Sequence, residues 1–506
     1  MKEVRCDVAV VGSGAGGGAV AAALAPLAQD GKRVLVLERG PRFRDDEFTG
    51  TELEMAPALY LDSGGFLTAD GTMTLAAGQA YGGSTVVYTG TSLAPPERVI
   101  RSWGVPGLDH DDLVRRCGTY AGQNNVHLLP DAEINQNNRL FVEGCRAAGY
   151  RAEQFPVNVK GCLGSSLCNL GCPNQAKQGT NRVQLPAAEA RGVEVVTRAE
   201  VVRVAGGDGG GELQVQVSAP APGGKGLPSE WEPGNYRIRA RVVVLAGGVL
   251  GTVPLLHHSG FRKGLPRLGE GFTCHPAFIL VAEHPSRVVN DVGHPKSFFL
   301  DRSEEEGYVL ETCMYFPFTT AKNLTGFGRD HLLFMDAFSR LQMILVLACD
   351  RGVKGNRVEA DRNGAPVVHY DFTPRVRESL AAATRGAARI FFGAGARRVH
   401  APLADPPLME RGEADRIQER IRPEHFLPGK VSVSAAHLMG GAGMGRDASD
   451  SVTDHRGRVH GVPWLRVADA SLFPDALQIN PYLTIMALAD RVAEGVREEL
   501  GSLGEA

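Results

Sequence analysis

A glycine-rich turn between an apolar run and an alanine-rich run constrains the fold of this chain more than any other feature. Residues 6–25 read CDVAVVGSGAGGGAVAAALA, and residues 8–11 have the pattern of a buried strand. Gly12, Gly14 and Gly17 follow the spacing G-x-G-x-x-G. The first glycine permits a tight turn, the second lets a pyrophosphate approach the backbone, and the third lets helix and strand pack closely. The stretch therefore predicts a strand, a phosphate-binding turn and a helix whose N-terminus faces the phosphates.

A second strand-like run strengthens the prediction of a dinucleotide site. Residues 33–38 read RVLVLE and end in Glu38. An acidic residue at that strand end is placed to accept hydrogen bonds from an adenosine ribose. A glycine-rich turn in some other α/β fold is the alternative, and the second strand with its acidic end disfavours it.

The overall composition is that of a globular protein without the excess positive charge that attracts polyanions. The chain has 506 residues, of which 43% are hydrophobic and 22% charged, and its net charge is −3. This length favours two domains or more, and the slightly negative charge argues against a nucleic-acid partner. Nine cysteines are too few for a disulfide scaffold at this length.

The first residues, MKEVRCDVAVVGSG, run from a charged start straight into a strand. They lack the apolar region and cleavage site of a signal peptide, and no apolar run reaches the roughly 18 residues that a membrane helix needs. We therefore expect a cytoplasmic protein without a membrane span. Export in complex with a signal-bearing partner is the alternative.

Two further segments suit a long cofactor. Residues 76–90 read AAGQAYGGSTVVYTG and predict a loop that wraps a second part of such a cofactor. Residues 462–496 predict a strand, a loop and a final helix. Asp469 stands at the end of that strand, where its carboxylate is placed to accept hydrogen bonds from ribityl hydroxyls. The NPYLT segment then opens the helix, whose N-terminal end favours negative charge.

Together these motifs resemble those of the glucose–methanol–choline (GMC) oxidoreductase family, whose members bind FAD. The resemblance covers nearly the whole chain, and its parts come in family order. After the first glycine motif they are the GGST loop, then TRAEVVRV at 197–204, VVVLAGGVLGTVPLLHHSG at 242–260, LGEGFTCHP at 268–276 and HLMGGAGMG at 437–445.

The resemblance implies a set of FAD-binding residues, within which Val201 lies beside the adenine. Three departures from the family pattern are Tyr88 in place of a frequent Asn, a one-residue displacement of Pro254, and Cys274 in place of Asp before His275. His275 itself is expected to support a loop over the flavin. The implied FAD-binding residues are Gly12, Gly14, Ala15, Gly17, Glu38, Arg39, Gly78, Gly82, Gly83, Ser84, Val201, Ala246, Gly247, Asp469, Ala470, Asn480 and Pro481.

The family architecture implied by the resemblance is α/β, with a Rossmann-like FAD-binding domain and an antiparallel-sheet substrate-binding domain, as in p-hydroxybenzoate-hydroxylase-like folds. We expect a discontinuous FAD-binding domain from residues 1–100, 180–270 and 455–506. Residues 101–179 are expected to form a cysteine-containing connecting segment, and residues 271–454 the substrate-binding domain. Turn-rich stretches on both sides of LQVQV, at 213–217, predict a hairpin excursion within the FAD-binding part.

Alcohol oxidation by a flavin requires a hydride to leave the carbinol carbon and a proton to leave the hydroxyl. Histidine suits the proton acceptor, and a hydrogen-bond donor suits the oxygen on which charge gathers. His437 and Asn480 occupy the two positions where the family carries its catalytic pair, so we assign His437 as base and Asn480 as its partner at the substrate oxygen. Without the resemblance, His437 reads as structural and Asn480 as a helix N-cap.

Three cysteines lie close together in residues 161–180, GCLGSSLCNLGCPNQAKQGT. The spacing of Cys162, Cys168 and Cys172 is C-x5-C-x3-C, which is not a zinc pattern but allows a cluster of three irons. Within the family, the catalytic subunits of some bacterial sugar dehydrogenases carry a similar segment that holds a [3Fe–4S] cluster. Long-chain alcohol oxidases have a similar stretch without a known cluster, so a compact loop of buried thiols is the alternative.

We therefore expect an FAD-dependent alcohol oxidase or dehydrogenase, with oxygen or another electron acceptor. One alternative is the catalytic subunit of an electron-transferring complex that uses a [3Fe–4S] cluster and a partner subunit. Another is a flavin-bearing binding protein, which the intact His437 and Asn480 disfavour. If the aromatic-rich stretch at 314–346 lines the pocket, an apolar or bulky alcohol is favoured over a small polar sugar.

Overall fold

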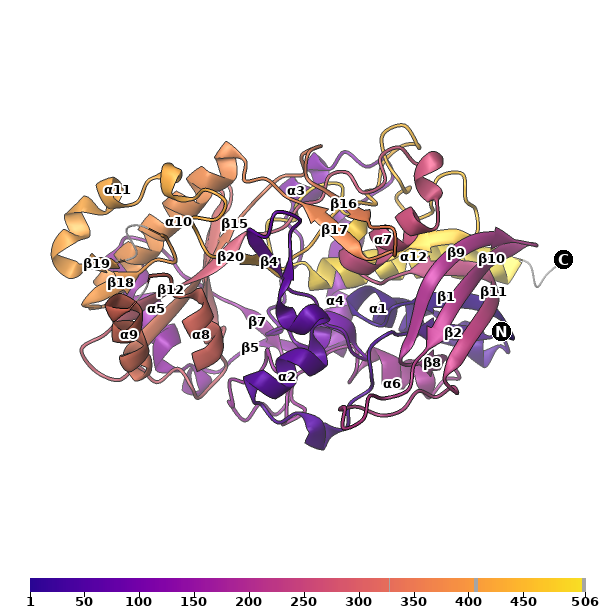
Figure 1. The fold of residues 1–506 in the computed structure, drawn as a ribbon, viewed down its shortest axis with the longest axis horizontal. Coiled ribbons are helices and arrows are strands. Elements are labelled where there is room, and N and C mark those ends of the chain that lie inside the picture. Colours follow the sequence, from indigo (N-terminus) through magenta and orange to yellow (C-terminus); the bar gives the residue numbers. More distant parts are fainter. Residues whose placement is uncertain (327, 405–407, 503–506) are drawn as a thin grey trace.

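Two large sheets occupy opposite ends of an elongated molecule (Figure 1). The structure, a computed structural model, describes residues 1–326, 328–404 and 408–502. Within these ranges no helix combines the length and the apolar composition needed to cross a membrane.

The first sheet has seven strands in the order β8-β2-β1-β11-β10-β9, with β21 paired to β11. Pairing is parallel among β8, β2, β1, β11 and β21. All four residues of β2 are buried, as is usual for a parallel strand covered on both faces. The strands are β1 (Lys2–Val11), β2 (Val34–Leu37), β8 (Glu194–Val196), β9 (Ala199–Gly207), β10 (Gly210–Val217), β11 (Gly234–Leu245) and β21 (Leu465–Val467).

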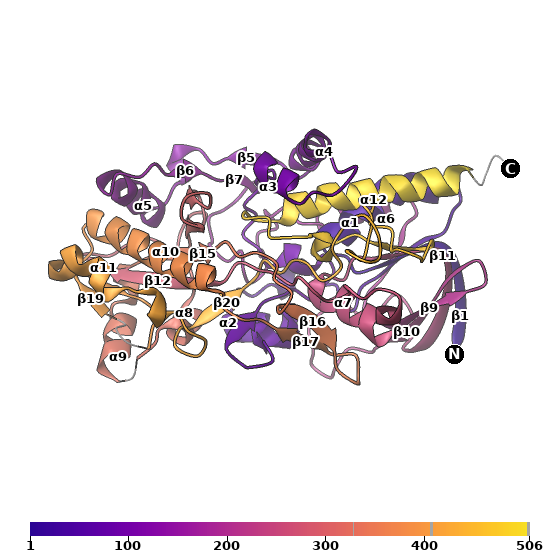
Figure 2. The same ribbon diagram turned by 90° about the horizontal axis from the view of Figure 1, so that it is seen from above.

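The predicted hairpin excursion is confirmed, because β9, β10 and β11 pair antiparallel in succession. The predicted final helix is also present as α12 (Tyr482–Ser502), which packs along α1 (Ala15–Gln29), as Figure 2 shows. Two shorter helices, α6 (Gln184–Glu189) and α7 (Val249–His258), contact α1 and β9 respectively.

The second sheet has ten strands in the order β3-β4-β20-β12-β15-β14-β13-β6, with β18 paired to β12 and β19. Most pairs are antiparallel, whereas β4 and β20 run parallel. The strands are β3 (Phe66–Leu67), β4 (Met73–Leu75), β6 (Glu153–Gln154), β12 (Ala277–Glu283), β13 (Phe298–Arg302), β14 (Tyr308–Thr312), β15 (Leu341–Ala348), β18 (Arg398–His400), β19 (Leu408–Glu410) and β20 (Val433–Ala435).

Helices α10 (Pro374–Gly393) and α5 (Gln136–Ala147) pack on each other, and both contact β14 and β15. Pro374 starts α10 after the N-cap Thr373, whose side chain accepts from the backbone N–H of Val376. Every residue of β12 and β15 is buried, so this sheet is covered on both faces. Strands β3, β4 and β6 join it from residues before 180, and the domain boundaries given above stay a prediction.

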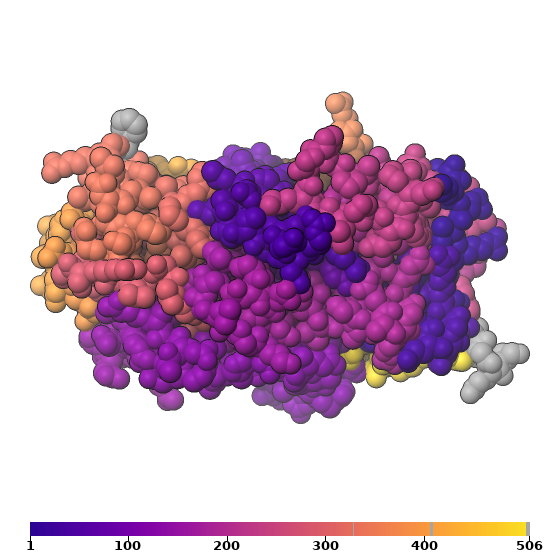
Figure 3. Space-filling view, turned by 90° about the horizontal axis from the view of Figure 1, so that it is seen from below, coloured from indigo at the N-terminus to yellow at the C-terminus, as the bar shows by residue number. Residues whose placement is uncertain are grey.

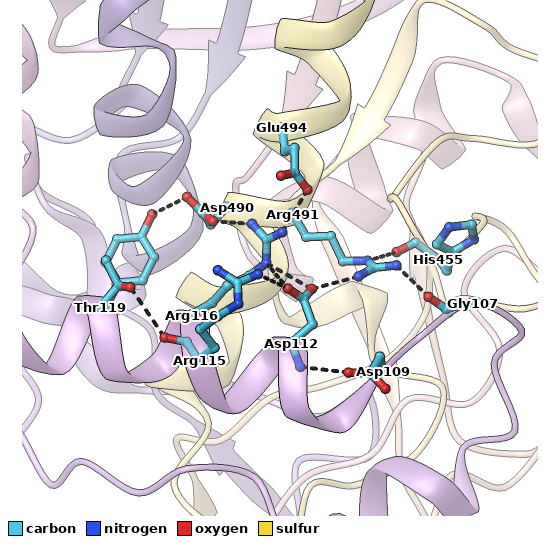
Figure 4. Close-up of polar contacts among 11 residues, drawn as sticks. Gly107, Asp109, Asp112, Arg115, Arg116, Thr119, His455, Asp490, Arg491 and Glu494 are labelled. Carbon is cyan, nitrogen blue, oxygen red and sulfur yellow. Dashed lines mark hydrogen bonds and ion pairs between the residues drawn. The ribbon is translucent and has the colours of Figure 1, made fainter.

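An ion-pair network joins a helix in the first quarter of the chain to the last helix (Figure 4). In α4 (His110–Gln123), Arg116 is only 6% exposed and donates to Asp112, Asp490 and Glu494. Arg491 of α12 also donates to Asp112, at 2.7 Å. Because one arginine serves three carboxylates, α4 is held against α12 by charge as well as by packing.

Candidate active site

The first glycine motif brings three backbone segments into contact. Gly12 has a φ of +100°, and a Cβ there would lie 2.4 Å from the carbonyl oxygen of Ala246, at the end of β11. A Cβ at Gly17 would lie 2.0 Å from the carbonyl oxygen of Gly12. Both positions therefore require glycine, for the reasons of tight turn and close packing expected from the motif.

The second glycine loop lies directly on the first. A Cβ at Gly83 would come within 2.7 Å of the Cα of Gly14. The N–H of Gly82 donates to the hydroxyl of Ser13 at 2.9 Å, and the N–H of Gly78 donates to the hydroxyl of Ser84 at the same distance. The structure thus brings together predicted residues that lie about seventy positions apart in the sequence, and it adds Ser13, which the motif spacing does not single out.

Glu38 lies buried at the end of β2, next to the first glycine turn. Its carboxylate accepts from the N–H and hydroxyl of Ser13, at 3.0 and 2.6 Å, and from the N–H of Gly40 at 2.7 Å. Burial raises the pKa of Glu38, and these donors oppose the shift. Arg39 follows, half-buried, and Val201 is half-buried on β9. Contact of these side chains with an adenosine stays a prediction.

Asp469 fixes a turn at the same carboxyl edge of the sheet as the first glycine motif. Its carboxylate accepts from the N–H and hydroxyl of Ser471, at 2.8 and 2.6 Å, from the N–H of Gly248 at 2.9 Å and from the hydroxyl of Thr252 at 2.5 Å. Burial raises the pKa of Asp469. These bonds connect Ala470 and its neighbours to the start of α7, where Gly247 is exposed. The role of Asp469 toward ribityl hydroxyls stays a prediction.

These features fit the dinucleotide part of FAD. Two loops meet through backbone atoms where a side chain has no room, and the N-terminus of α1 opens beside them. Unpaired N–H groups at a helix N-terminus, approached by a bare backbone, make a phosphate site. Ala15 is the first residue of α1, and Pro481 directly precedes α12.

His437 lies against a second histidine, His275. Backbone bonds of 2.9 Å in both directions between Thr273 and Met439 align the two segments. They place the Nδ1 atoms of His275 and His437 2.9 Å apart, with the rings almost perpendicular at 88°. Burial lowers the pKa of both rings well below its ordinary value, and the neighbouring Lys296 lowers that of His437 further. Both histidines are therefore neutral near pH 7, as a general base must be.

A cavity lies beside this histidine pair, and His275 is the member of the pair that lines it. His275 and Asn480 both line it, whereas its other walls come mainly from strands β13, β14 and β15. Among the described residues His437 is hydrogen-bonded to His275 and not to Asn480, and His437 itself does not line the cavity. The lining residues are Leu93, His275, Phe299, Asp301, Val309, Glu311, Leu347, Cys349, Gln478, Ile479 and Asn480.

Two expectations about this region change. Asn480 is not the cap of the last helix, because α12 begins at Tyr482 and the carbonyl of Pro481 accepts its first bond, from the N–H of Ile485 at 2.9 Å. The aromatic-rich stretch at 314–346 contributes none of the residues that line the cavity. Its helices α8 (Pro317–Asn323) and α9 (Arg329–Asp336) lie beside strand β12 of the second sheet (Figure 1).

The three clustered cysteines line a separate, small cavity. Beside it, the buried ammonium of Lys177 donates to the carbonyls of Cys168, Val86 and Tyr88. It thereby ties the cysteine loop to the segment that follows the second glycine loop. The loop also packs under α2 (Glu52–Leu59), which lies at the surface midway along the molecule (Figure 3).

The donor set of this loop does not fit a metal centre as it stands. Within the described ranges, no group of three or more His, Cys, Asp or Glu side chains is arranged to hold a metal ion. Burial also raises the pKa of Cys162, and raises that of Cys168 to about 12. Iron–sulfur clusters bind thiolates, so this environment works against ligation.

Comparison with known sequences identifies the family of these motifs. Two family models, both described as GMC oxidoreductase, match residues 56–277 and 353–489. An uncharacterized GMC-type oxidoreductase of Mycobacterium tuberculosis is 32% identical over 498 residues, which covers 97% of this chain and 75% of that protein. A long-chain-alcohol oxidase of Arabidopsis thaliana is 27% identical over 534 residues, covering 98% of this chain and 68% of that protein.

Solved structures share the fold at lower sequence identity. Pyridoxine 4-oxidase from Mesorbium loti has a TM-score of 0.70 and 17% identity, with 97% of this chain and 99% of that chain covered. A formate oxidase structure has a TM-score of 0.70 and 14% identity, with 99% of this chain and 100% of that chain covered. At this identity the likeness concerns the fold, which is the α/β architecture with an FAD-binding domain expected from the sequence.

Proposed function

The chain belongs to the GMC oxidoreductase family, and from this premise we propose that it oxidises the CH–OH group of an alcohol to a carbonyl. The observation that carries the proposal is the buried pair of His437 and His275, of which His275 lines a cavity together with Asn480. Relatives named long-chain-alcohol oxidases support an alcohol substrate and oxygen as one acceptor. Family membership favours an enzyme over a flavin-bearing binding protein.

Within this proposal, His437 takes the proton of the substrate hydroxyl. A histidine must be neutral to do so, and burial together with Lys296 keeps the pKa of His437 low. Asn480 holds the substrate oxygen by its side-chain amide, a group that donates without titrating. His275 orients the ring of His437 through the bond between their Nδ1 atoms. FAD, when bound, supplies the acceptor for the hydride of the carbinol carbon.

We assign the FAD-holding role to both glycine loops and to the turn at Asp469. Gly14, Gly83 and the start of α1 would hold the phosphates, because their backbones meet without intervening side chains. Glu38 would face the ribose from the end of β2. Ala246 and Gly247 would border the cofactor at the end of β11.

The test is anaerobic bleaching of the flavin by a panel of primary and secondary alcohols. We expect at least one alcohol to bleach the wild-type flavin, and His437→Ala to lower the reduction rate by roughly 10²–10⁴-fold while retaining FAD. His127→Ala is the matched control, because His127 is exposed, lies on β5 (Val126–Leu128) and does not line the cavity. Fast reduction of His437→Ala would contradict the assignment of the base.

A second candidate function is a subunit that passes electrons through a [3Fe–4S] cluster to a partner. Its support is that Cys162, Cys168 and Cys172 line one cavity, beside which Lys177 donates to the carbonyl of Tyr88, in the loop predicted to wrap the cofactor. We place it second because the thiols, as they lie, do not form a metal-binding group. Iron and acid-labile sulfide per FAD, on protein purified without air, decide between the two. About three irons per flavin would favour the cluster, since each iron takes one protein thiolate.

A further inference from the structure

The cavity wall is a patch of alternating residues on three neighbouring strands. Phe299 of β13 lies opposite Glu311 of β14, and Val309 of β14 lies opposite Leu347 of β15. Because successive side chains of a strand point to opposite faces, residues at these positions share one face of the sheet. That face is apolar apart from the carboxylates of Asp301 and Glu311.

Glu311 brings a half-satisfied charge to this apolar wall. The residue is 0% exposed, and one of its oxygens, Oε2, accepts from the ammonium of Lys296. The other oxygen, Oε1, is buried and has no hydrogen-bond partner. A buried anionic oxygen without a donor is unfavourable, and in native proteins such an atom calls for a ligand, an ion or a water.

His275 has a second unpartnered atom at the same cavity. Its Nδ1 faces His437, whereas its Nε2 is buried without a partner, although the side chain is only 2% exposed. For His437 to act as base through Nε2, its own hydrogen must lie on Nδ1 and be donated to Nδ1 of His275. The hydrogen of His275 then lies on Nε2. This tautomer presents a donor, His275 Nε2–H, and an acceptor, Glu311 Oε1, to one cavity.

The charge of Glu311 is balanced by Lys296, and the other carboxylate of this wall, Asp301, belongs to an exposed residue whose charge solvent screens. Lys296 neutralises Glu311 as an ion pair, so the pair leaves no net negative charge to attract an ammonium group. Lys296 also lies near enough to His437 to repel a proton from its ring. A neutral hydroxyl suits this environment, because it donates one hydrogen bond and accepts another without adding charge.

We infer that the cavity selects an uncharged alcohol that carries a second hydroxyl group, which donates to Oε1 of Glu311 while His275 Nε2–H holds a substrate oxygen. The substrate class is therefore diols and polyols rather than simple alkanols or amino alcohols. This inference rests on the proposed alcohol oxidation and makes Glu311 its specificity-determining residue.

The first experiment compares ligands on the FAD-loaded enzyme. Anaerobic stopped-flow reduction with primary alcohols, diols and protonated amino alcohols of three to six carbons gives a Kd and a limiting rate for each. We expect the diols to bind roughly tenfold more tightly than alkanols of equal length, as fits a hydrogen bond to a charged acceptor, and amino alcohols to bind most weakly. Equal Kd values for diols and alkanols would overturn the inference while leaving alcohol oxidation intact.

A double variant tests the assignment to Glu311. Glu311→Leu combined with Lys296→Met removes both charges together and avoids an unpaired buried ion. We expect it to lose the diol preference, measured as the ratio of the Kd for a diol to the Kd for the alkanol of equal length, whatever its rate of flavin reduction. Asp301→Asn is the matched control, because Asp301 lines the same face and accepts from the N–H of Ser303 at 2.8 Å. Asp301→Asn should keep the diol preference. If Asp301→Asn loses the preference and the double variant keeps it, the role assigned to Glu311 is overturned.

A third measurement does not depend on turnover. Pinacol, a diol of two tertiary carbinols, has no carbinol hydrogen to transfer, and 2,3-dimethylbutan-2-ol is its counterpart with one hydroxyl. Isothermal titration of the oxidised enzyme should give tighter binding of pinacol in the wild type and equal binding in the double variant. If no alcohol reduces the flavin but pinacol still binds more tightly, the proposed function fails and the recognition stands. Equal binding in the wild type would overturn the recognition.

Discussion

The two large sheets present their sites to a ligand in different ways. At the seven-stranded sheet the site is made of backbone: Gly12, Gly17 and Gly83 stand where a Cβ would meet another main-chain atom within 2.7 Å. At the ten-stranded sheet the site is made of side chains, which β13, β14 and β15 direct from alternate positions into one cavity. A change at the first site therefore alters the chain path, whereas a change at the second alters the chemistry.

This difference predicts two kinds of mutant phenotype. Substitutions in the glycine loops should remove FAD whatever the new side chain can do chemically. Substitutions around the cavity should leave FAD in place and change rate or selectivity.

The largest effect is expected for Gly17→Ala. Its new Cβ would lie 2.0 Å from the carbonyl oxygen of Gly12, so α1 must move away from β1. We expect purified protein with little or no FAD, measured as flavin absorbance relative to protein. Gly118→Ala makes the same chemical change in α4, where nothing lies within 4 Å of the added carbon, and should be stabilising by about 1 kcal/mol. A Gly17→Ala variant with full FAD content would contradict the claim that the glycine loops hold FAD through a backbone path that tolerates no side chain.

The second effect concerns the joint between α4 and α12. Arg116→Met removes a buried cation that three partly exposed carboxylates share, whereas Asp112 keeps Arg491. We expect the free energy of unfolding to fall by about 3 kcal/mol, the low end for breaking a buried ion pair. Arg115→Met is the control, because Arg115 is 66% exposed in its side chain and an exposed pair contributes about 0–1 kcal/mol. Denaturant titration measures both, and equal losses would contradict the burial argument.

The third effect tests whether His275 orients the ring of His437 without itself taking the proton. His275→Gln removes the ring that faces His437 and should slow flavin reduction roughly tenfold, equivalent to about 1.4 kcal/mol, while FAD content is unchanged. His400→Gln is the control. His400 is also buried, but it lies on β18 and its ring is hydrogen-bonded to the carbonyl of Thr325. Loss of FAD in His275→Gln would mean that the histidine supports the cofactor site instead.

The smallest effect is an absence of pH dependence. His437 acts as base only when neutral, and its neutral form prevails above its pKa. Because burial lowers that pKa well below its ordinary value near 6.5, the rate of flavin reduction should stay level as pH falls from 8 to 5.5. A decline centred near pH 6.5 would show that the folded-state pKa is not depressed.

The sequence predicted the backbone site far better than the side-chain site, and the reason is physical. Glycine spacing encodes a turn locally, so Gly12, Gly14 and Gly17 indicate their own geometry within six residues. Glu311 and Lys296 carry no such local signal. They meet only because β13 and β14 pair in one register, and no motif of the sequence specifies that register.

His275 was partly predictable from the sequence: more so than Glu311 and Lys296, but less so than the glycines. It precedes Pro276 in a segment that resembles a family motif, and this resemblance predicts that His275 supports a loop over the flavin. The bond to His437 depends on the backbone pairing of Thr273 with Met439, which lie more than 160 positions apart. Likewise, the aromatic-rich stretch at 314–346 has the composition of a pocket wall, yet it fills core and helices, the commoner fate of such residues.

The most direct test of the central claim is stopped-flow reduction of the FAD-loaded enzyme by its best alcohol, with hydrogen or deuterium on the carbinol carbon, in the wild type and in His437→Ala. Oxidation of the CH–OH group with His437 as base predicts slower wild-type reduction by the deuterated alcohol and a severe loss of rate in the variant. Reduction at equal rates with both isotopes, and undiminished in His437→Ala, would contradict it.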